Sequence, residues 1–218
     1  MPSPSFLTTT NVMTFQDQDP LSGGLSSASS QILKFVMDFQ TQTNWCWAAV
    51  SKSVASFFDK KSAWTQCSIA NSALKGQPGA VKCCVKPVNS KCNIPWYLGK
   101  ALGVVGAFSR RANKAESFST VKGEVASKKP LCVRTGWTTG GGHFLAIIGW
   151  TETAAGVQYY EVTDPIYGRQ TIKVSTFKSS YRGVGRWTHS YFVTDPTAGG
   201  GTMVMASATS IDAAMLGA

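Results

Sequence analysis

The pattern of apolar residues changes once along this chain, and that change limits the folds open to it. From residue 44 to about residue 102, apolar side chains recur at helical spacing, and Trp47, Val50 and Val54 fall on one helix face. From about 103 to 194, apolar segments are short, rich in β-branched and aromatic residues, and separated by turn residues, which is typical of strands. Helices followed by antiparallel strands predict an α+β fold, with an N-terminal helical lobe, a C-terminal β-sheet lobe and a cleft between them.

The expected helices and strands follow from the same patterns. In the first lobe we expect helices at 44–59, 65–74 and 94–102, the first of them with Asn44 as N-cap. In the second lobe we expect a helix at 115–127 and strands at 103–109, 131–137, 143–150, 157–163, 170–177 and 187–194. Together they indicate one domain over residues 31–196.

Both ends of the sequence differ in composition from this domain. Residues 1–30 are rich in Ser, Thr, Pro, Gly and Gln and predict a flexible leader, and residues 197–218 predict a flexible tail. No segment approaches the roughly 18 apolar residues of a membrane helix. The first twenty residues have neither the basic region nor the apolar run of a signal peptide. We therefore expect neither a membrane protein nor Sec export.

The chain is basic, with 21 Lys and Arg against 11 Asp and Glu. The excess is concentrated between Lys60 and Arg134, where Glu116 and Glu124 are the only acids. Such a surface attracts acidic partners. The basic residues are scattered, however, and no nucleic-acid-binding motif accompanies them, so a solvated cationic surface is favoured over a nucleic-acid partner.

Cys46 lies at about the second position of the first expected helix. The unpaired N–H groups and the dipole at a helix N-terminus stabilise an anion such as a thiolate, and cysteines in such places are among the reactive ones. A buried structural thiol is the alternative for a cysteine on an Ala-rich helix face. A histidine base placed beside Cys46 would favour catalysis.

The chain has two histidines, and His143 is the stronger candidate for that base. It follows three glycines and opens an apolar strand, and the next strand ends at Asp164. Antiparallel pairing about the turn at 153–156 predicts His143 opposite Asp164. A carboxylate there would fix the imidazole tautomer and stabilise its charged form. His189, with Asp195 six residues later, is the reserve candidate.

An oxyanion site is the third requirement of amide cleavage by a thiol. The backbone N–H of Cys46 would supply one donor, and a side-chain amide just upstream would supply the second. Gln40 and Gln42 both lie within reach along the loop, and Gln40 is preferred.

These residues resemble the signature of papain-like cysteine peptidases. The pattern is Q-x5-C followed by W-A-A, then G-H-x-x-x-I-x-G and a later D-P. The sequence is most similar to the bacterial effector branch that includes the type III-secreted avirulence protease of plant pathogens. It also resembles the peptidases that cleave leaders after double glycine. The resemblance covers about residues 36–165.

The resemblance implies a papain-like fold and a cysteine endopeptidase that needs no metal or cofactor. Cys46 matches the nucleophile, His143 the general base, Asp164 the residue that orients the base, and Gln40 the oxyanion donor. The implied chemistry is acyl transfer through a thioester. Papain has Asn where this chain has Asp164, and it has a propeptide that this chain lacks, so papain's substrate preference does not carry over.

The other five cysteines indicate a separate feature. Cys132 lies in an apolar strand and is expected to be a buried thiol. Four cysteines fall within residues 67–92, and because a bridge between neighbouring Cys83 and Cys84 is strained, two pairings remain: 67–83 with 84–92, or 67–84 with 83–92. Zinc is one rival, but the spacing lacks the usual C-x2-4-C, and four free thiols are the other. Disulfides favour an oxidising location, and without a Sec signal they indicate a dedicated secretion system, with delivery into a target cell.

The expected partners are a protein or peptide substrate and a cognate inhibitor or immunity protein. Leu21-Ser22-Gly23-Gly24 is similar to the end of a double-glycine leader, which suggests Gly-Gly sites and self-processing at Gly24–Leu25. A flexible linker is the plainer interpretation of that segment. Two alternatives to a secreted protease remain: a deamidase or acyltransferase with the same triad, and a non-catalytic, cationic, disulfide-braced binding module.

Overall fold

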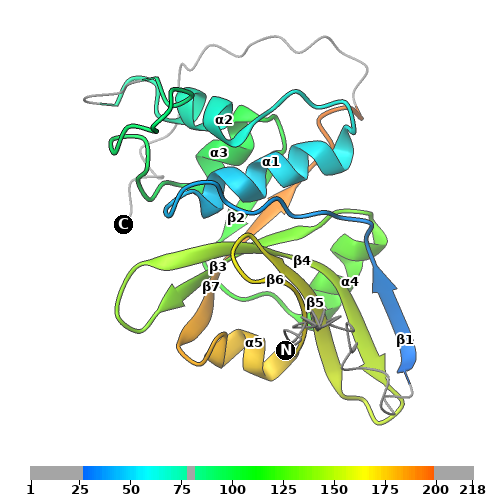
Figure 1. The fold of residues 1–218 in the computed structure, drawn as a ribbon. Coiled ribbons are helices and arrows are strands. Elements are labelled where there is room, and N and C mark those ends of the chain that lie inside the picture. The colour runs from blue at the N-terminus through cyan, green and yellow to red at the C-terminus, as the bar shows by residue number, and fades with distance from the viewer. Residues whose placement is uncertain (1–26, 78–81, 199–218) are drawn as a thin grey trace, which may run out of the picture.

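The computed structural model describes residues 27–77 and 82–198. Within them the chain forms two lobes (Figure 1), one made of helices and one built on a seven-stranded sheet. The fold is α+β, as the sequence predicts, with helices first and strands afterwards. The predicted C-terminal tail beyond residue 198, most of the predicted leader and the suggested cleavage site at Gly24–Leu25 lie outside the described residues.

The helices of the first lobe are α1 (Cys46–Phe58), α2 (Gln66–Ala73) and α3 (Leu98–Val104). Trp47, Val50 and Val54 of α1 are fully buried, which confirms the helical spacing. At the start of α2, the side chains of Thr65 and Ser68 accept each other's backbone N–H groups in a capping box. Burial along α1 and the cap of α2 thus explain why both helices begin close to where the sequence predicts.

Two predicted features of this lobe are wrong. Trp45, not Asn44, is the N-cap residue of α1, because the Asn44 side-chain amide donates to the carbonyl of Asn93 instead. The helix expected at 94–102 begins only at Leu98, since residues 92–94 form turns whose carbonyls, at Cys92 and Ile94, accept hydrogen bonds from the start of α1. The strand expected at 103–109 is correspondingly delayed and starts at Phe108.

The sheet is antiparallel throughout, in the order β2-β7-β3-β4-β5-β6, with β1 paired to β4. Its strands are β1 (Ser27–Ile32), β2 (Phe108–Ala112), β3 (Leu131–Trp137), β4 (Gly142–Thr153), β5 (Gln158–Asp164), β6 (Gly168–Lys173) and β7 (Gly185–Val193). The long strand β4 pairs with β3 over its first half and with β1 over its second half. β4 is therefore the central strand of this lobe.

Two further predictions for the sheet lobe need correction. Residues 27–30, expected in the leader, belong to β1, whose hydrogen bonds to β4 order them. Residues 174–177, expected to end a strand, begin helix α5 (Val174–Ser180). Phe177 of this helix is buried against Tyr160 and Trp187, so aromatic packing overrides the β-branched local sequence.

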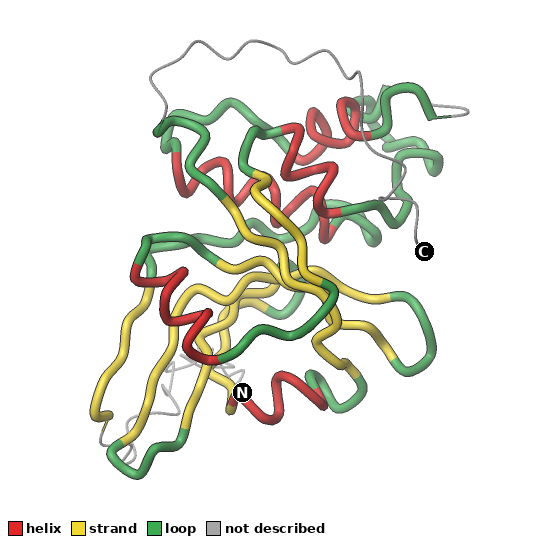
Figure 2. The backbone as a smooth tube through the Cα atoms, turned by 180° about the vertical axis from the view of Figure 1, so that it is seen from behind, coloured by secondary structure: helices red, strands yellow, loops and turns green. Residues whose placement is uncertain are grey.

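The two lobes are tied together by strands and by helix packing. Figure 2 shows two strands rising from the sheet toward the helices, and these are β2 and β7, both of which contact α3. Helix α1 packs on β4, and α4 (Phe118–Ala126) covers β1, β3 and β4. None of the helices in the described part of the chain is long and apolar enough to cross a lipid bilayer.

Disulfides close the loops of the helical lobe. Cys67 bonds to Cys84 and Cys83 to Cys92, which is one of the two pairings that the sequence left open. The zinc alternative is therefore wrong, because all four thiols are consumed. Cys132 is a buried free thiol as predicted, and burial raises its pKa to about 12.

Candidate active site

Cys46 is the first residue of α1 and lines a cleft of about 750 Å³ between the lobes. It is a free thiol and only 9% exposed. The first turn of a helix has N–H groups without intrahelical acceptors, and Cys46 belongs to that turn. The sulfur is thus placed where negative charge is stabilised and a substrate can reach it.

His143 faces Cys46 from the start of β4. It is 4% exposed, and its ring is stacked 6.1 Å from that of Trp137. The Nε2–H donates to Asp164 Oδ1 at 2.9 Å, which leaves Nδ1 for the hydrogen bond with Cys46. Burial lowers the pKa of His143, but the hydrogen bonds and charges of Asp164 and Cys46 outweigh it and raise the pKa to about 9. At neutral pH the ring is therefore a cation, with the Asp164 carboxylate on one side and the Cys46 sulfur on the other.

Asp164 ends β5 and is completely buried. Its Oδ1 accepts from His143 and from the backbone N–H groups of Ile166 and Tyr167, and its Oδ2 accepts from the Tyr181 hydroxyl at 2.8 Å. Burial raises the pKa of this carboxyl, but the hydrogen bonds and the charge of His143 lower it below the usual value. A buried carboxylate with four donors is fixed in both charge and orientation.

The β4–β5 register differs from the prediction while bringing the same two residues together. Ala146 is paired with Thr163, so Asp164 would fall opposite Leu145 and not opposite His143. His143 lies two residues from that position, on the same face of the sheet, within diagonal reach of the carboxylate. The sequence thus identified the pair although its register was two residues off.

Gln40 lies in the loop before Cys46, and its amide is already engaged. Its Nε2 donates to the carbonyls of Gln42 and Thr43 at 2.9 and 2.8 Å, and its backbone N–H donates to Pro165. Its Oε1 is buried and has no hydrogen-bond partner within the described ranges. Gln40 therefore holds the turn before Cys46, and an oxyanion would receive its N–H only in exchange for one of these two bonds.

Sequence reasoning missed two residues that position this site. Gln66 of α2 accepts the backbone N–H of Thr41 and donates to the carbonyl of Phe39, so it holds both sides of Gln40. Tyr181 binds Asp164 from the segment after α5. Neither residue has a local sequence signature, because each acts through a contact with a distant part of the chain.

His189 lies in the same cleft but without the partner that the sequence suggested. Its Nδ1 is 2.9 Å from the Thr188 hydroxyl, and Asp195 accepts from Thr197 instead. Burial and the charges of Arg134 and Arg111 lower the pKa of His189. The cleft therefore contains two imidazoles in opposite electrostatic settings, and only the one at His143 is paired with a carboxylate.

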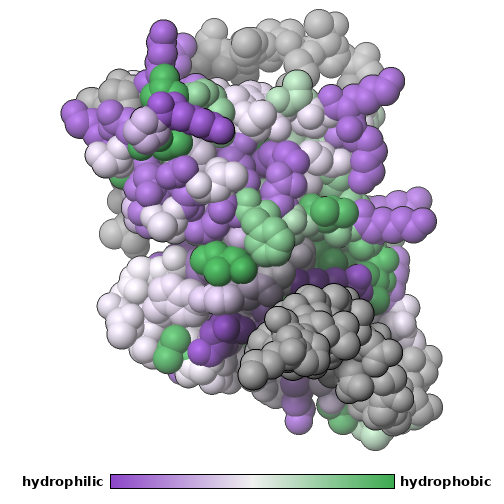
Figure 3. Space-filling view, viewed as in Figure 1, coloured by the Kyte–Doolittle hydropathy of each residue, from purple (hydrophilic) through white to green (hydrophobic). Residues whose placement is uncertain are grey.

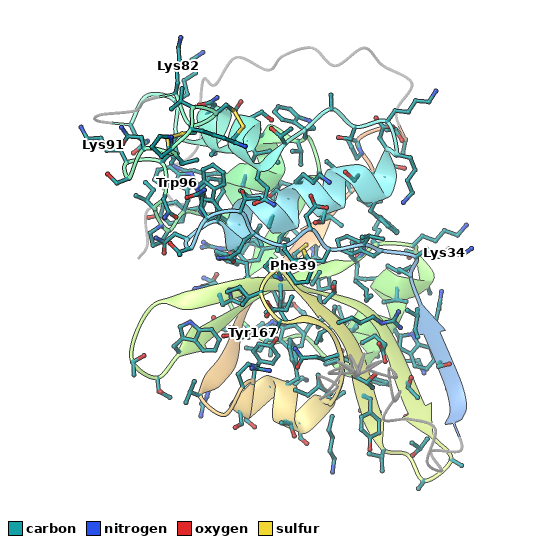
Figure 4. All side chains as sticks on the ribbon, in the orientation of Figure 1. Lys34, Phe39, Lys82, Lys91, Trp96 and Tyr167 are labelled. Atoms are coloured by element: carbon teal, nitrogen blue, oxygen red, sulfur yellow. A yellow bond between two sulfur atoms is a disulfide. The ribbon has the colours of Figure 1, made fainter. Side chains whose placement is uncertain are left out.

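Residues 92–97, which we call the strap, connect the disulfides to the cleft. The indoles of Trp45 and Trp47 donate to the carbonyls of Cys92 and Ile94 at 2.7 and 3.0 Å. The last three residues of the strap, Pro95 to Tyr97, line the cleft. Figure 4 shows Trp96 on the helical lobe and Tyr167 on the sheet lobe. The Cys83–Cys92 bridge thus holds one wall of the cleft against the residues that flank Cys46.

The chemistry of the site is that of a thiol, an imidazole and a carboxylate in series. Across residues 27–77 and 82–198, no group of three or more His, Cys, Asp or Glu side chains is arranged to hold a metal ion. The series itself matches a nucleophile, a base and a group that orients the base.

A comparison with protein families agrees with this chemistry. The model of the family described as papain-like cysteine protease AvrRpt2 matches residues 29–182, well over half of the chain. No curated protein matches the sequence. Among solved structures, a C39-like peptidase from Bacillus anthracis is similar with 13% identity and a TM-score of 0.48, over 75% of this chain and 97% of that one. A double glycine motif protease from an AMS/PCAT transporter, solved with its leader peptide, has 17% identity and a TM-score of 0.41, over 75% and 95% of the two chains.

Proposed function

Because the chain belongs to the family of papain-like cysteine proteases that includes AvrRpt2, we propose that Cys46, His143 and Asp164 form its catalytic triad. The observation that carries the proposal is the position of His143, which is hydrogen-bonded to the thiol on one side and to a buried carboxylate on the other. A cysteine whose base is itself oriented by an acid is the arrangement for nucleophilic attack on a carbonyl.

In the proposed reaction, the Cys46 sulfur attacks the carbonyl carbon of a peptide bond. The negative charge moves to the carbonyl oxygen, where the N–H groups at the head of α1 stabilise it, with Gln40 as second donor once one of its loop bonds is exchanged. His143 then protonates the leaving amine, and the C–N bond breaks to leave a thioester. Water, deprotonated by His143, attacks the thioester and releases the acid and the thiol.

Asp164 has an electrostatic and an orienting role in this scheme. Because it is ionised and buried beside Nε2, it keeps the Nδ1 side of His143 toward the sulfur and stabilises the imidazolium. The two disulfides support the further proposal that the protein works outside a reducing cytosol, as a bacterial effector or toxin delivered by a non-Sec route. A cognate inhibitor that covers the cleft belongs to the same proposal.

The test is to compare new protein N-termini in target-cell lysate treated with the wild type or with Cys46→Ala. The proposal expects termini that appear only with the wild type and disappear with His143→Ala. A deamidase would instead add about 1 Da per modified amide without new termini, which would overturn the peptidase assignment. Intact-mass measurement of the two proteins tests self-processing at Gly24–Leu25: a loss of the first 24 residues in the wild type alone supports it, and equal masses contradict it.

A further inference from the structure

The cleft that contains Cys46 is positively charged along one side. Arg111, Arg134 and His189 line it together with Tyr191, and its described lining includes no Asp or Glu. A second, smaller hollow of about 300 Å³ continues the same side and adds Lys100 and Arg110, again without an acid among its described lining residues. Clefts lined by charge of one sign concentrate ligands of the opposite sign.

Strand pairing places Arg134 and Arg111 in a row that crosses β3, β7 and β2 and begins opposite Phe144. Arg134 on β3 is paired with Phe144, the residue after His143, and also with His189 on β7. On the far side of β7, Tyr191 is paired with Arg111 on β2. Since neighbouring strands lie about 4.8 Å apart, the row extends from about 5 to about 15 Å from β4. An extended peptide rises about 3.3 Å per residue, so the far end of the row lies about four substrate residues from β4.

The two arginines are held in place without a compensating anion. Arg134 donates to the Thr188 hydroxyl and to the carbonyl of Gly141, and Arg111 donates to the Tyr191 hydroxyl. Gly142 makes room for the first of them, because a Cβ at that position would lie 2.7 Å from the Arg134 guanidinium carbon. Neither arginine belongs to any ion pair within the described part of the chain. Both keep N–H groups for a carboxylate.

Two other half-buried cations have carboxylate partners, whereas Lys100, Lys129 and Lys178 have none within the described residues. Lys52 is paired with Asp38 and Lys122 with Glu152 on the outer surfaces of the two lobes. Arg134 and Arg111 both line the cleft together with His189, and their charges lower its pKa, although burial has the larger effect. The two half-buried arginines are hydrogen-bonded to hydroxyls and a carbonyl but to no carboxylate. A bound anion would supply the negative charge that this site lacks.

The opposite side of His143 has apolar side chains. Because β4 lies between β3 and β5, the turn after β5 is on the side away from the arginines, and it presents Ile166 and Tyr167, both 44% exposed. Phe39, 65% exposed, belongs to the loop that is hydrogen-bonded to this turn. Figure 3 shows apolar side chains gathered in the middle of this face, and Figure 4 places Phe39 and Tyr167 there. The lining of the cleft is thus cationic on one side of the triad and apolar on the other, although Arg182, outside the lining, stacks on the ring of Tyr167.

We propose that this protease selects peptide segments with an Asp or Glu within about four residues of the scissile bond, on one side of it only, bound by Arg134 and Arg111. The apolar turn receives the segment on the other side of the bond. The proposal rests on the peptidase function and adds the substrate class. It also fixes the direction in which the chain lies across the sheet, from the β5–β6 turn toward β2.

Cleavage of a proteome-derived peptide library tests it. The double variant Arg111→Gln with Arg134→Gln removes both charges, and Arg186→Gln is the matched control, since Arg186 is exposed on β7 and lines neither hollow. We expect acidic residues to be enriched at one position on one side of wild-type cleavage sites. We expect kcat/KM for an acidic peptide to exceed that for the same peptide with Gln in place of the acid by about tenfold or more. The double variant should lose this preference and the control should keep it. Cleavage without such enrichment contradicts the proposal.

A second measurement does not depend on peptide hydrolysis. Iodoacetate is an anion and iodoacetamide is neutral. The rate of Cys46 alkylation by iodoacetate divided by the rate with iodoacetamide therefore reports the electrostatic potential in the cleft. We expect the ratio to fall several-fold in the double variant and to stay at the wild-type value in the control. If no peptide is cleaved but the ratio falls, the anion site is supported and the peptidase function fails. An unchanged ratio overturns the anion site, and Arg111→Gln alone repeats the test if the double variant does not fold.

Discussion

Replacing Asp164 with asparagine removes one charge from the site and leaves the hydrogen bonds in place. The asparagine oxygen can still accept from His143, Ile166 and Tyr167, and its amide can donate to the Tyr181 hydroxyl, which would turn to accept. The variant is therefore expected to fold, and any change in the titration of His143 reports the charge. Asp164→Ala, which removes the hydrogen bonds as well, is the comparison for a structural effect.

The size of the effect follows from the titration of His143. Raising its pKa from 6.5 to about 9 corresponds to about 3 kcal/mol of added preference for the imidazolium, at about 1.36 kcal/mol per pKa unit. Asp164 provides the largest of the raising effects and Cys46 the remainder. Without the aspartate charge, we expect the proton affinity of His143 to fall by about a factor of ten or more.

Proton NMR titration of the imidazoles measures this directly, because the chain has only two histidines. In the wild type we expect His143 to titrate near pH 9 and His189 below its usual range. In Asp164→Asn the pKa of His143 should fall and that of His189 should not move. A wild-type His143 that titrates near 6.5, or a pKa that is the same in both proteins, would refute the electrostatic account of the triad.

The same shifts predict how stability depends on pH. His143 has a raised pKa in the folded state, so its contribution is complete below about pH 6.5 and is lost as the pH rises through about 9. The pKa of Asp164 is lowered from 3.8, so its contribution is present above that value and is lost in stronger acid. The free energy of unfolding of the wild type should exceed that of Asp164→Asn most between about pH 4 and pH 6.5, by at most about 3 kcal/mol.

Three further substitutions test the residues that support the site. Tyr181→Phe leaves Oδ2 of the buried carboxylate without its hydroxyl donor and should lower the free energy of unfolding by about 1–3 kcal/mol in urea denaturation; an unchanged midpoint and slope would contradict that role. Gln66→Leu releases the loop around Gln40 and should lower kcat about tenfold or more while Cys46 still reacts with iodoacetamide; full activity would show that the loop needs no such support. Replacing Cys83 and Cys92 together by serine should cost about 2–4 kcal/mol and lower activity, whereas equal activity would mean that the strap holds without its bridge.

Much of the fold could be predicted from local patterns. The strand at Leu131–Trp137 has the predicted bounds, and the first helix, Cys46–Phe58, falls within the predicted 44–59, since apolar periodicity and burial agree there. The β4–β5 register was missed because the hairpin turn is centred on Ala155, where the N–H of Thr153 donates to the carbonyl of Val157. A pairing of His143 with Asp164 would need a turn centred between Thr153 and Ala154. Residues 174–180 were missed because the burial of Phe177 decides their conformation.

The site shows the same division between local and long-range information. Cys46, His143 and Asp164 carry local signals: a helix start, a glycine turn before a strand, and a strand end. Gly140 and Gly141 have positive φ angles of 94° and 75° in that turn, which explains the glycines. The positioning residues Gln66 and Tyr181 can be identified only from the structure, because the packing of α2 and α5 brings them to the site from distant parts of the sequence.

The central claim is that the Cys46 sulfur is activated by the imidazole across the cleft. The most direct measurement is the rate of alkylation of that sulfur by iodoacetamide, followed by peptide mass spectrometry, in the wild type and in His143→Ala at pH 6. The account predicts rapid modification of Cys46 in the wild type and a rate at least a hundredfold lower without the imidazole, with the buried Cys132 unmodified in both. Equal, slow rates in the two proteins would contradict it.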